Sequence, residues 1–140
     1  MISEKRLLEE YAVRQQWLTE HALEQMKRHG LLAEGWKFEI ASFYDEEMRQ
    51  KAGLGCLLGN TVTHIDGKWN PHIFVYPTTM RQSKHEQRQT ILHEIAHAQT
   101  MVTVGDTEDH HGQTWLEQCG RIMPASMFWR EVLTLSAATR

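Results

Sequence analysis

The apolar positions between Ser3 and Gly30 recur at the spacing of a helix with one buried face. Serine is a residue type that caps the start of a helix, and glycine is one that ends it. The pattern predicts a helix over this segment, with its many charged residues on the solvent side. Its expected buried stripe consists of Leu7, Leu8, Tyr11, Leu18, Leu23 and Met26.

Three segments in the middle of the chain have the patterns of strands. Residues 36–40 alternate between apolar and charged, which is typical of a strand with one buried side. A longer, glycine-interrupted strand is predicted over 54–65, and the Asp66-Gly67 turn leads from it toward a third strand over 73–76. Glycines in and before the second strand indicate bends or close backbone approach rather than a flat ribbon. They occupy positions 53, 55 and 59.

A second helix is predicted to start at Ser83, because Ser83 and Glu86 have the capping-box spacing. The polar turn at 105–109 ends it. Apolar residues flank its length, so we expect it to be largely buried. They are Ile91, Leu92, Ile95, Ala96, Ala98 and Val102.

Two further helices are expected after that turn. One runs from His111 and Gly112 to Pro124, with Trp115 and Cys119 as core residues. Ser126 caps a last short helix, whose apolar side we expect to carry Phe128, Trp129 and Leu133. Together these elements predict an α+β fold in which a small antiparallel sheet packs on the helix that starts at Ser83.

Composition and length favour one compact domain over residues 1–140. The chain is 41% hydrophobic and 24% charged, an ordinary globular balance, and 140 residues can bury a real core. No apolar run approaches the length of a membrane span, and no secretory leader is visible, so we expect a cytoplasmic protein without a membrane partner. Two cysteines far apart, Cys56 and Cys119, are then expected to be reduced thiols. The sequence does not predict the oligomeric state.

The predicted second helix carries the segment His-Glu-Ile-Ala-His at 93–97. Positions four apart on a helix lie about 40° apart around its axis, so His93 and His97 can both aim a ring nitrogen at one metal ion. Glu94 lies beside that face, where it can deprotonate a metal-activated water without occupying the metal. The elongated metzincin motif is excluded, because its further glycine and histidine positions fall here on Thr100 and Thr103.

His111, fourteen residues after His97, is the predicted third ligand. The competing candidates are the adjacent His110, the carboxylates Glu108 and Asp109 in the same turn, and Glu117, whose spacing some zinc proteases use. Three neutral imidazoles would leave a Zn²⁺ ion with one open position for water, as in a catalytic zinc site.

The oxyanion formed during peptide hydrolysis needs a hydrogen-bond donor besides the metal. His110, Tyr76 and Arg81 are candidates for this donor, and the sequence does not rank them.

The histidine segment with its flanks, residues 90–98, and the His-Gly-x-x-Trp start of the next helix resemble the SprT-like metallopeptidases, which include the Spartan proteases of DNA–protein crosslink repair. Residues 36–38, 51–56 and 73–77 resemble the family's first, second and third strands. The resemblance implies a zincin-like SprT fold and a zinc-dependent endopeptidase. It also implies roles for four residues: His93, His97 and His111 as zinc ligands, and Glu94 as catalytic acid/base.

The chain departs from this resemblance in two ways. It has no Cys-x-x-Cys, so it lacks the zinc ribbon of many bacterial members. It also stops shortly after Met123, without the DNA-binding and partner-binding segments of Spartan-type enzymes. We therefore expect a minimal catalytic domain.

The charge pattern predicts weak intrinsic DNA binding. The formal net charge is −3, and the basic clusters at 27–28 and around Arg81, Lys84 and Arg88 are small. We expect a protein or peptide substrate instead. Two further hypotheses stay open, a catalytically silent binding module stabilised by zinc and a nucleic-acid-associated protein. Glu94 favours the enzyme over the silent module, because a structural zinc site needs no base and usually takes four protein ligands.

Overall fold

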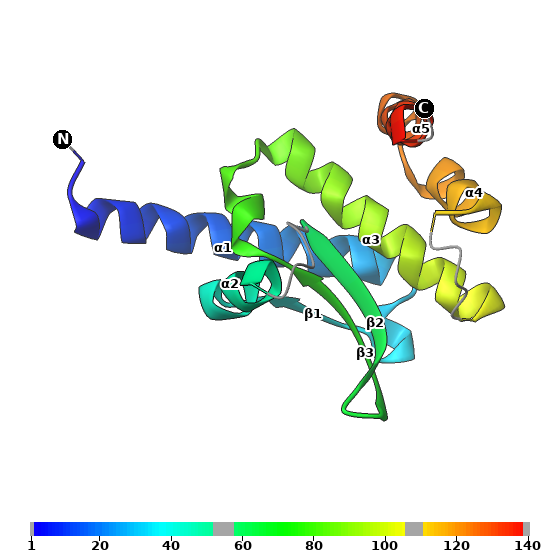
Figure 1. The fold of residues 1–140 in the computed structure, drawn as a ribbon, viewed down its shortest axis with the longest axis horizontal. Helices are drawn as coiled ribbons and strands as arrows, with labels where there is room; N and C mark the ends of the chain where they lie inside the picture. The colour runs from blue at the N-terminus through cyan, green and yellow to red at the C-terminus, as the bar shows by residue number, and fades with distance from the viewer. Residues whose placement is uncertain (1, 52–57, 106–110, 139–140) are drawn as a thin grey trace.

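The computed structural model describes residues 2–51, 58–105 and 111–138, which form helices around a small sheet (Figure 1). The elements in chain order are α1 (Glu4–Arg28), the 3₁₀ turn η1 (Leu32–Glu34), β1 (Lys37–Ile40), α2 (Phe43–Lys51), β2 (Gly59–Ile65), β3 (Lys68–Val75), the 3₁₀ turn η2 (Pro77–Arg81), α3 (Lys84–Val104), α4 (Gln113–Ile122) and α5 (Ala125–Ala138). This arrangement confirms the α+β class. No described helix is long and apolar enough to cross a membrane.

The three strands form a mixed sheet in the order β1-β3-β2. β2 and β3 are an antiparallel hairpin, and the turn between them has positive φ at both Asp66 (53°) and Gly67 (76°), as a type I′ turn requires. β1 pairs with β3 in parallel, with Phe38 opposite Ile73. The predicted all-antiparallel sheet is therefore wrong at this pair. After β1 the chain passes through α2 and returns along β2, so β3 runs in the direction of β1.

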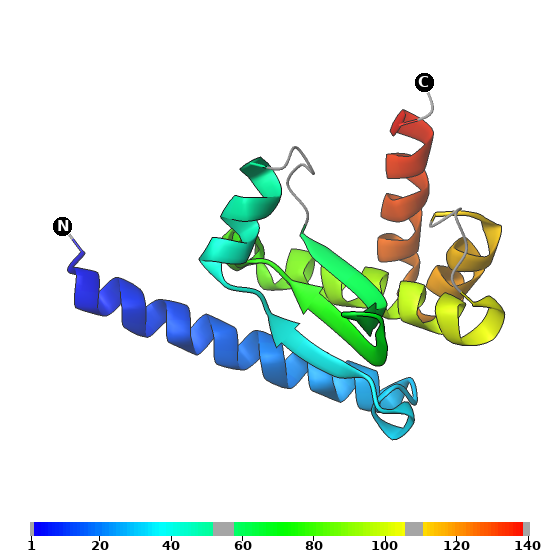
Figure 2. The ribbon, with the colours of Figure 1, turned by 60° about the horizontal axis from the view of Figure 1, so that its bottom comes forward.

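The core lies where the second half of α1, the sheet and α3 meet (Figures 1 and 2). Leu18 and Met26 of α1 are completely buried there, whereas Leu7 and Leu8 near its start are more than half exposed. The predicted buried stripe along all of α1 was therefore too long, and it was also wrong at Leu23 in the second half, which is 38% exposed. The first turns of α1 extend beyond the sheet and α3, so Leu7 and Leu8 have little in the described chain to pack against, whereas Tyr11 further along contacts the ring of Phe43.

Helix α3 is fixed to its surroundings at both ends. Ser83 and Glu86 make the predicted capping box at its start. Near that end the Gln87 side chain donates to the Thr79 carbonyl at 2.8 Å, and toward the other end Gln99 donates to the carbonyl of His29 at 2.6 Å. The predicted apolar flank is buried except for Val102, which is 43% exposed in the last turn. A helix held in this way is a firm support for the side chains on its remaining face.

Two features of the helices differ from the prediction. The helix α2 was not predicted, and the segment 52–57 that follows it, including the glycines at 53 and 55 and Cys56, lies outside the described residues. On α5, Trp129 and Leu133 are exposed, while Met127 and Glu131 face inward. The predicted apolar side of the last helix was therefore wrong for Trp129 and Leu133 but right for Phe128, which packs against the core. The carboxylate of Glu131 occupies part of the buried face.

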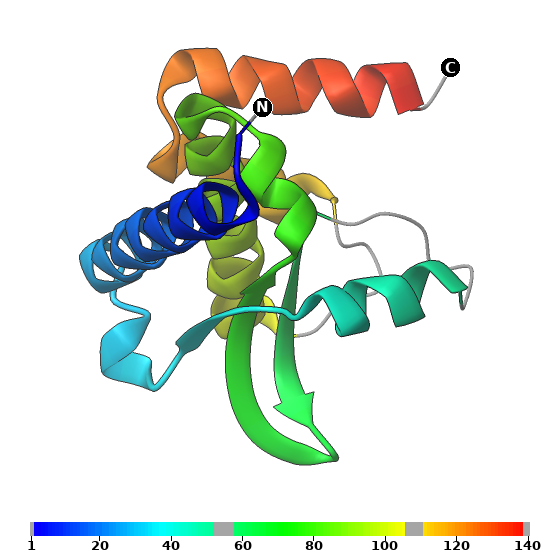
Figure 3. The same cartoon turned by 90° about the vertical axis from the view of Figure 1, so that its left-hand side faces the viewer.

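Helices α4 and α5 lie at one end of the molecule, and α5 crosses over α3 (Figures 2 and 3). The β2–β3 hairpin projects on the other side (Figure 3). β2 is an edge strand of the described sheet and lies next to α3. The exposed face of α3 is thus bordered by β2 on one side and by α5 on the other.

Candidate metal centre

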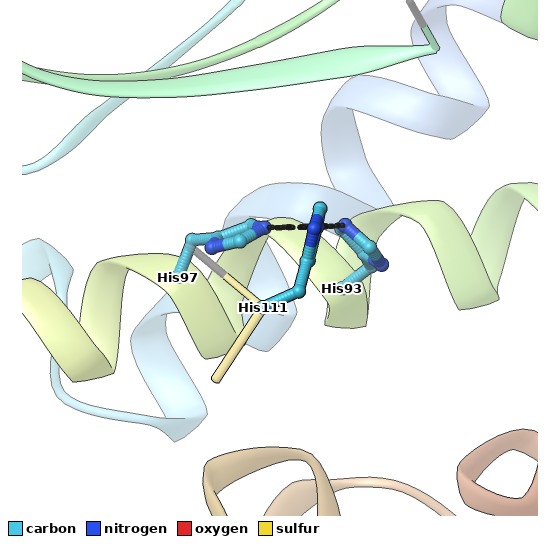
Figure 4. Close-up of side chains that lie close together, drawn as sticks. All are labelled: His93, His97 and His111. Atoms are coloured by element: carbon cyan, nitrogen blue, oxygen red, sulfur yellow. Dashed lines mark hydrogen bonds between the residues drawn. The ribbon is translucent and has the colours of Figure 1, made fainter. Parts of the chain in front are cut away.

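Three histidine rings converge above α3. His93 and His97 lie one turn apart on that helix, and His111 comes from the segment just before α4 (Figure 4). Their Nε2 atoms are 3.2 Å apart for His93 and His97, 3.2 Å for His97 and His111, and 3.3 Å for His93 and His111. The structure therefore brings together the three residues that the sequence singled out as ligands.

This spacing fits a metal ion. A ring nitrogen carries either a proton or a lone pair, so three nitrogens in mutual contact cannot all be paired by hydrogen bonds. Ligands of tetrahedral zinc at 2.0–2.1 Å lie roughly 3.3–3.4 Å from one another, close to the distances seen here. Among the described residues, these three histidines form a group that could hold a metal ion.

Glu117, a competing third ligand, does not reach the site. It is exposed on α4, and its carboxylate accepts a hydrogen bond from Gln113 at 3.4 Å. It is not part of the histidine group. The remaining competitors, His110, Glu108 and Asp109, lie outside the described residues. The geometry thus favours His111 over Glu117.

Trp115 forms a buried platform beneath the histidines. Its ring centroid lies 4.9 Å from that of His93, 5.3 Å from that of His97 and 4.8 Å from that of His111. It is 1% exposed, and its indole N–H points to the His93 carbonyl at 3.4 Å. The sequence predicted a core residue at this position, and the contact with all three rings adds a second role. The only available signal was its place four residues after His111.

Glu94 lies beside the histidines with its side chain packed closely against β2. Its side chain is almost fully buried, and Oε1 accepts a hydrogen bond from the Thr61 hydroxyl at 2.8 Å. The other oxygen, Oε2, is 3.9 Å from Nε2 of His93. Burial raises the pKa of the Glu94 carboxyl above its usual range, although His93 and the Thr61 hydroxyl act in the opposite direction. A carboxylate with raised proton affinity is suited to accept a proton.

Gly59 at the start of β2 allows the strand to approach Glu94. A Cβ atom at this position would lie 2.9 Å from Glu94 Cγ, closer than real Cβ atoms come, and a tight 3.1 Å from Oε2. The close backbone approach predicted for this glycine is therefore confirmed. The part played by Thr61, two residues later on the same strand, was not predicted from the sequence.

The other ring nitrogen of His93, Nδ1, contacts a second carboxylate. Oε1 of Glu131 on α5 lies 3.2 Å from Nδ1 of His93, and Gln89 donates to the same oxygen at 3.1 Å. Burial alone would raise the pKa of the Glu131 carboxyl, but the hydrogen bonds from His93 and Gln89 hold it below its usual range. Glu131 is therefore ionised at neutral pH. Nothing in the sequence pattern pointed to it.

A pocket of about 380 Å³ opens next to His93 and Glu94. One side of α3 forms its floor, β2 borders it through Leu58 and Gly59, and α5 borders it opposite. Most of the residues that line it are polar or charged types. Of the predicted oxyanion donors, neither Tyr76 nor Arg81 lines this pocket, and His110 lies outside the described residues.

The chain belongs to the SprT-like family. A profile of that family matches residues 15–134, from the middle of α1 to the last turns of α5. The match covers nearly the whole chain and includes the three histidines and Glu94. No curated protein and no solved structure matches the chain significantly.

Proposed function

We propose that the protein is a zinc-dependent endopeptidase. The observation that carries this proposal is the convergence of three histidine nitrogens next to a buried carboxylate, in a chain that belongs to the SprT-like family. His93, His97 and His111 would hold the ion. When bound, zinc would supply a Lewis acid that makes water nucleophilic at neutral pH and polarises the peptide carbonyl.

Glu94 would act as the general base and acid. Thr61 occupies Oε1, which leaves Oε2 on the histidine side to take a proton from the attacking water. As the carbon–nitrogen bond of the peptide breaks, the same carboxyl returns this proton to the leaving amine. The restricted space around Glu94, set by Gly59 and Thr61, keeps the carboxylate in one orientation for both transfers.

The substrate would bind as an extended segment along β2. This strand is an edge of the described sheet beside α3, and an added strand can pair with the free backbone groups of such an edge. A side chain near the cleaved bond could enter the pocket next to Glu94. Extended binding favours unfolded or flexible protein segments, including those of proteins attached to DNA.

A cleavage assay with the Glu94→Gln variant tests this proposal. The variant should keep its zinc, because the ligands are unchanged, and lose proteolysis of an unfolded protein by roughly 10²-fold or more. Zinc content by elemental analysis and cleavage rates measured on the same samples provide the comparison. The His97→Ala variant is the control that should lose both. Wild-type proteolysis by Glu94→Gln would contradict the assignment of the base.

We propose further that the catalytic domain itself has little affinity for DNA. Its net charge of −3 opposes the approach of phosphates, and its basic clusters are small. Titration of labelled single- and double-stranded DNA should show weak binding that disappears as salt rises. Sub-micromolar binding that survives roughly 150 mM salt would reveal a DNA site and contradict this part of the proposal.

A further inference from the structure

Glu131 is the buried polar residue on a helix whose neighbouring side chains largely face solvent. It is 8% exposed, whereas Trp129 is 59% exposed and Leu133 68%. A buried carboxylate needs partners, because the loss of hydration costs several kcal/mol. The partners of Glu131 are Gln89 and His93, both on α3. The contact between α5 and α3 is therefore built around this charge.

Glu131 contacts the ring nitrogen of His93 that does not face the other two histidines, so it is not placed as a metal ligand. Its Oε1 contacts Nδ1, while Nε2 of the same ring faces His97 and His111. The two nitrogens flank the Cε1 atom of the imidazole, and their N–H and lone-pair directions diverge in the ring plane. A carboxylate at Nδ1 accepts the ring N–H, so the proton stays on Nδ1 and the lone pair stays on Nε2, directed at the other histidines.

Gln89 holds the carboxylate in place. It lies one turn before His93 on the same face of α3, so both side chains reach the same oxygen of Glu131. The Gln89 amide nitrogen also donates to the Met127 carbonyl at 3.2 Å, one turn before Glu131 on α5. Four residues thus join the two helices in a network in which His93 occupies one fixed place.

We propose that Glu131 is a positioning residue of the metal centre, which orients His93 through its Nδ1 hydrogen while Gln89 holds the carboxylate in place. In this arrangement α5 contributes to the metal site through the hydrogen bond between Glu131 and His93. The inference rests on the metal ligands of the proposed function, but it does not depend on the hydrolytic reaction.

Metal affinity is the primary test. Loss of an outer partner of a histidine ligand typically weakens metal binding by roughly 10–100-fold, and we expect a loss in this range for Glu131→Ala. Glu131→Gln keeps an acceptor oxygen at the same reach, so it should restore most of the affinity, to within about tenfold of the wild type. Competition with a chelator of known zinc affinity measures both values.

The matched control is Leu133→Ala, which changes an exposed side chain on the same helix. It should bind zinc as the wild type does. The absorption spectrum of the Co²⁺-loaded proteins gives a second measurement, because it reports the arrangement of the ligands. We expect a changed spectrum for Glu131→Ala, a smaller change for Glu131→Gln and none for Leu133→Ala.

The outcomes separate a positioning role from a merely structural one. Wild-type zinc affinity and an unchanged cobalt spectrum in a folded Glu131→Ala would overturn the proposal. If that variant does not fold, as circular dichroism of the apoprotein would reveal, Glu131→Met decides, because it fills similar space without an acceptor oxygen. Wild-type zinc affinity and an unchanged cobalt spectrum in Glu131→Met would overturn the proposal. Failure of the proposed peptidase reaction would appear differently, as normal metal binding without cleavage in the wild-type protein.

Discussion

The elements on the two sides of α3 contact different residues of the candidate site. On the sheet side, β2 contacts Glu94 through Thr61 and the bare backbone of Gly59, at the edge of an open pocket. On the helical side, α4 and α5 contact the histidines through Trp115 and Glu131. The difference indicates that the sheet holds the proposed base, Glu94, and that the helices hold the candidate metal ligands. Changes on one side should therefore leave the other intact.

The largest effect is expected on the helical side, from His111→Ala. Removing one of three ligands should weaken zinc binding by more than the roughly 100-fold that an outer partner costs, and proteolysis should disappear with the metal. Elemental analysis after dialysis measures the zinc. Glu117→Ala, six residues later on α4, is the control and should keep both zinc and activity. Loss of zinc in the Glu117 variant would indicate that Glu117 is a metal ligand. It would contradict the assignment of His111 and the comparison of the two sides.

A change on the sheet side should spare the metal. The methyl group of Gly59→Ala would collide with the Glu94 side chain and displace it, so we expect proteolysis to fall by about 10–100-fold at unchanged zinc content. Gly120→Ala on α4 is the matched control, because its added Cβ would meet Phe128 at an ordinary 3.6 Å. Loss of zinc from the Gly59 variant would show that the two sides are coupled.

A milder change on the same side is Thr61→Val, which keeps the shape of the residue and removes its hydroxyl. Glu94 then loses the 2.8 Å hydrogen bond to Oε1, and we expect a rate about tenfold lower with no change in zinc affinity. Steady-state kinetics on a fluorogenic peptide would place the loss in kcat rather than KM. An undiminished kcat would mean that Gly59 alone is enough to orient the base.

The smallest effect is expected in the labelling rate of Cys119, which reports how closely the helical side is packed. Burial raises the pKa of its thiol to about 12, and the charge of Glu131 adds to the shift. At pH 8 the reactive thiolate is then roughly 10³-fold rarer than in an ordinary cysteine, so iodoacetamide should label the folded Cys56→Ser variant very slowly. The rate should rise about tenfold per pH unit. Folding raises the pKa of this thiol, so the unfolded chain loses the proton at a lower pH than the folded chain does. The free energy of unfolding should therefore fall as pH rises above about 8.5. Fast labelling at pH 8 would show that this side is open.

The sequence was informative where the chemistry is local. His93, Glu94 and His97 share one helix, so their relative positions follow from helical geometry, and the capping box located the start of that helix. His111 stands at the beginning of the next element. For these residues, spacing along the chain was a good guide to arrangement in space.

The hydrogen-bond partners of these residues could not be predicted, because they are distant from them in sequence. Thr61 lies 33 residues before Glu94, and Glu131 lies on another helix, where a carboxylate interrupts the buried face. The binary pattern predicts that apolar residues face inward, so it pointed to Trp129 and Leu133 instead. The direction of β1 beside β3 was missed for a related reason: pairing is decided by the path of the whole connection, which includes the unpredicted α2.

The order of His111 and Glu131 along the chain also bears on biosynthesis. About twenty residues separate the two. At a synthesis rate of about 5–20 residues per second, the third histidine precedes the carboxylate by roughly 1–4 s. During this interval a ribosome-bound chain already contains all three histidines, while the residue that we propose to orient His93 does not yet exist. If Glu131 orients His93 as proposed, the site reaches its full zinc affinity only after the synthesis of α5, and not when the last of the three histidines has been added.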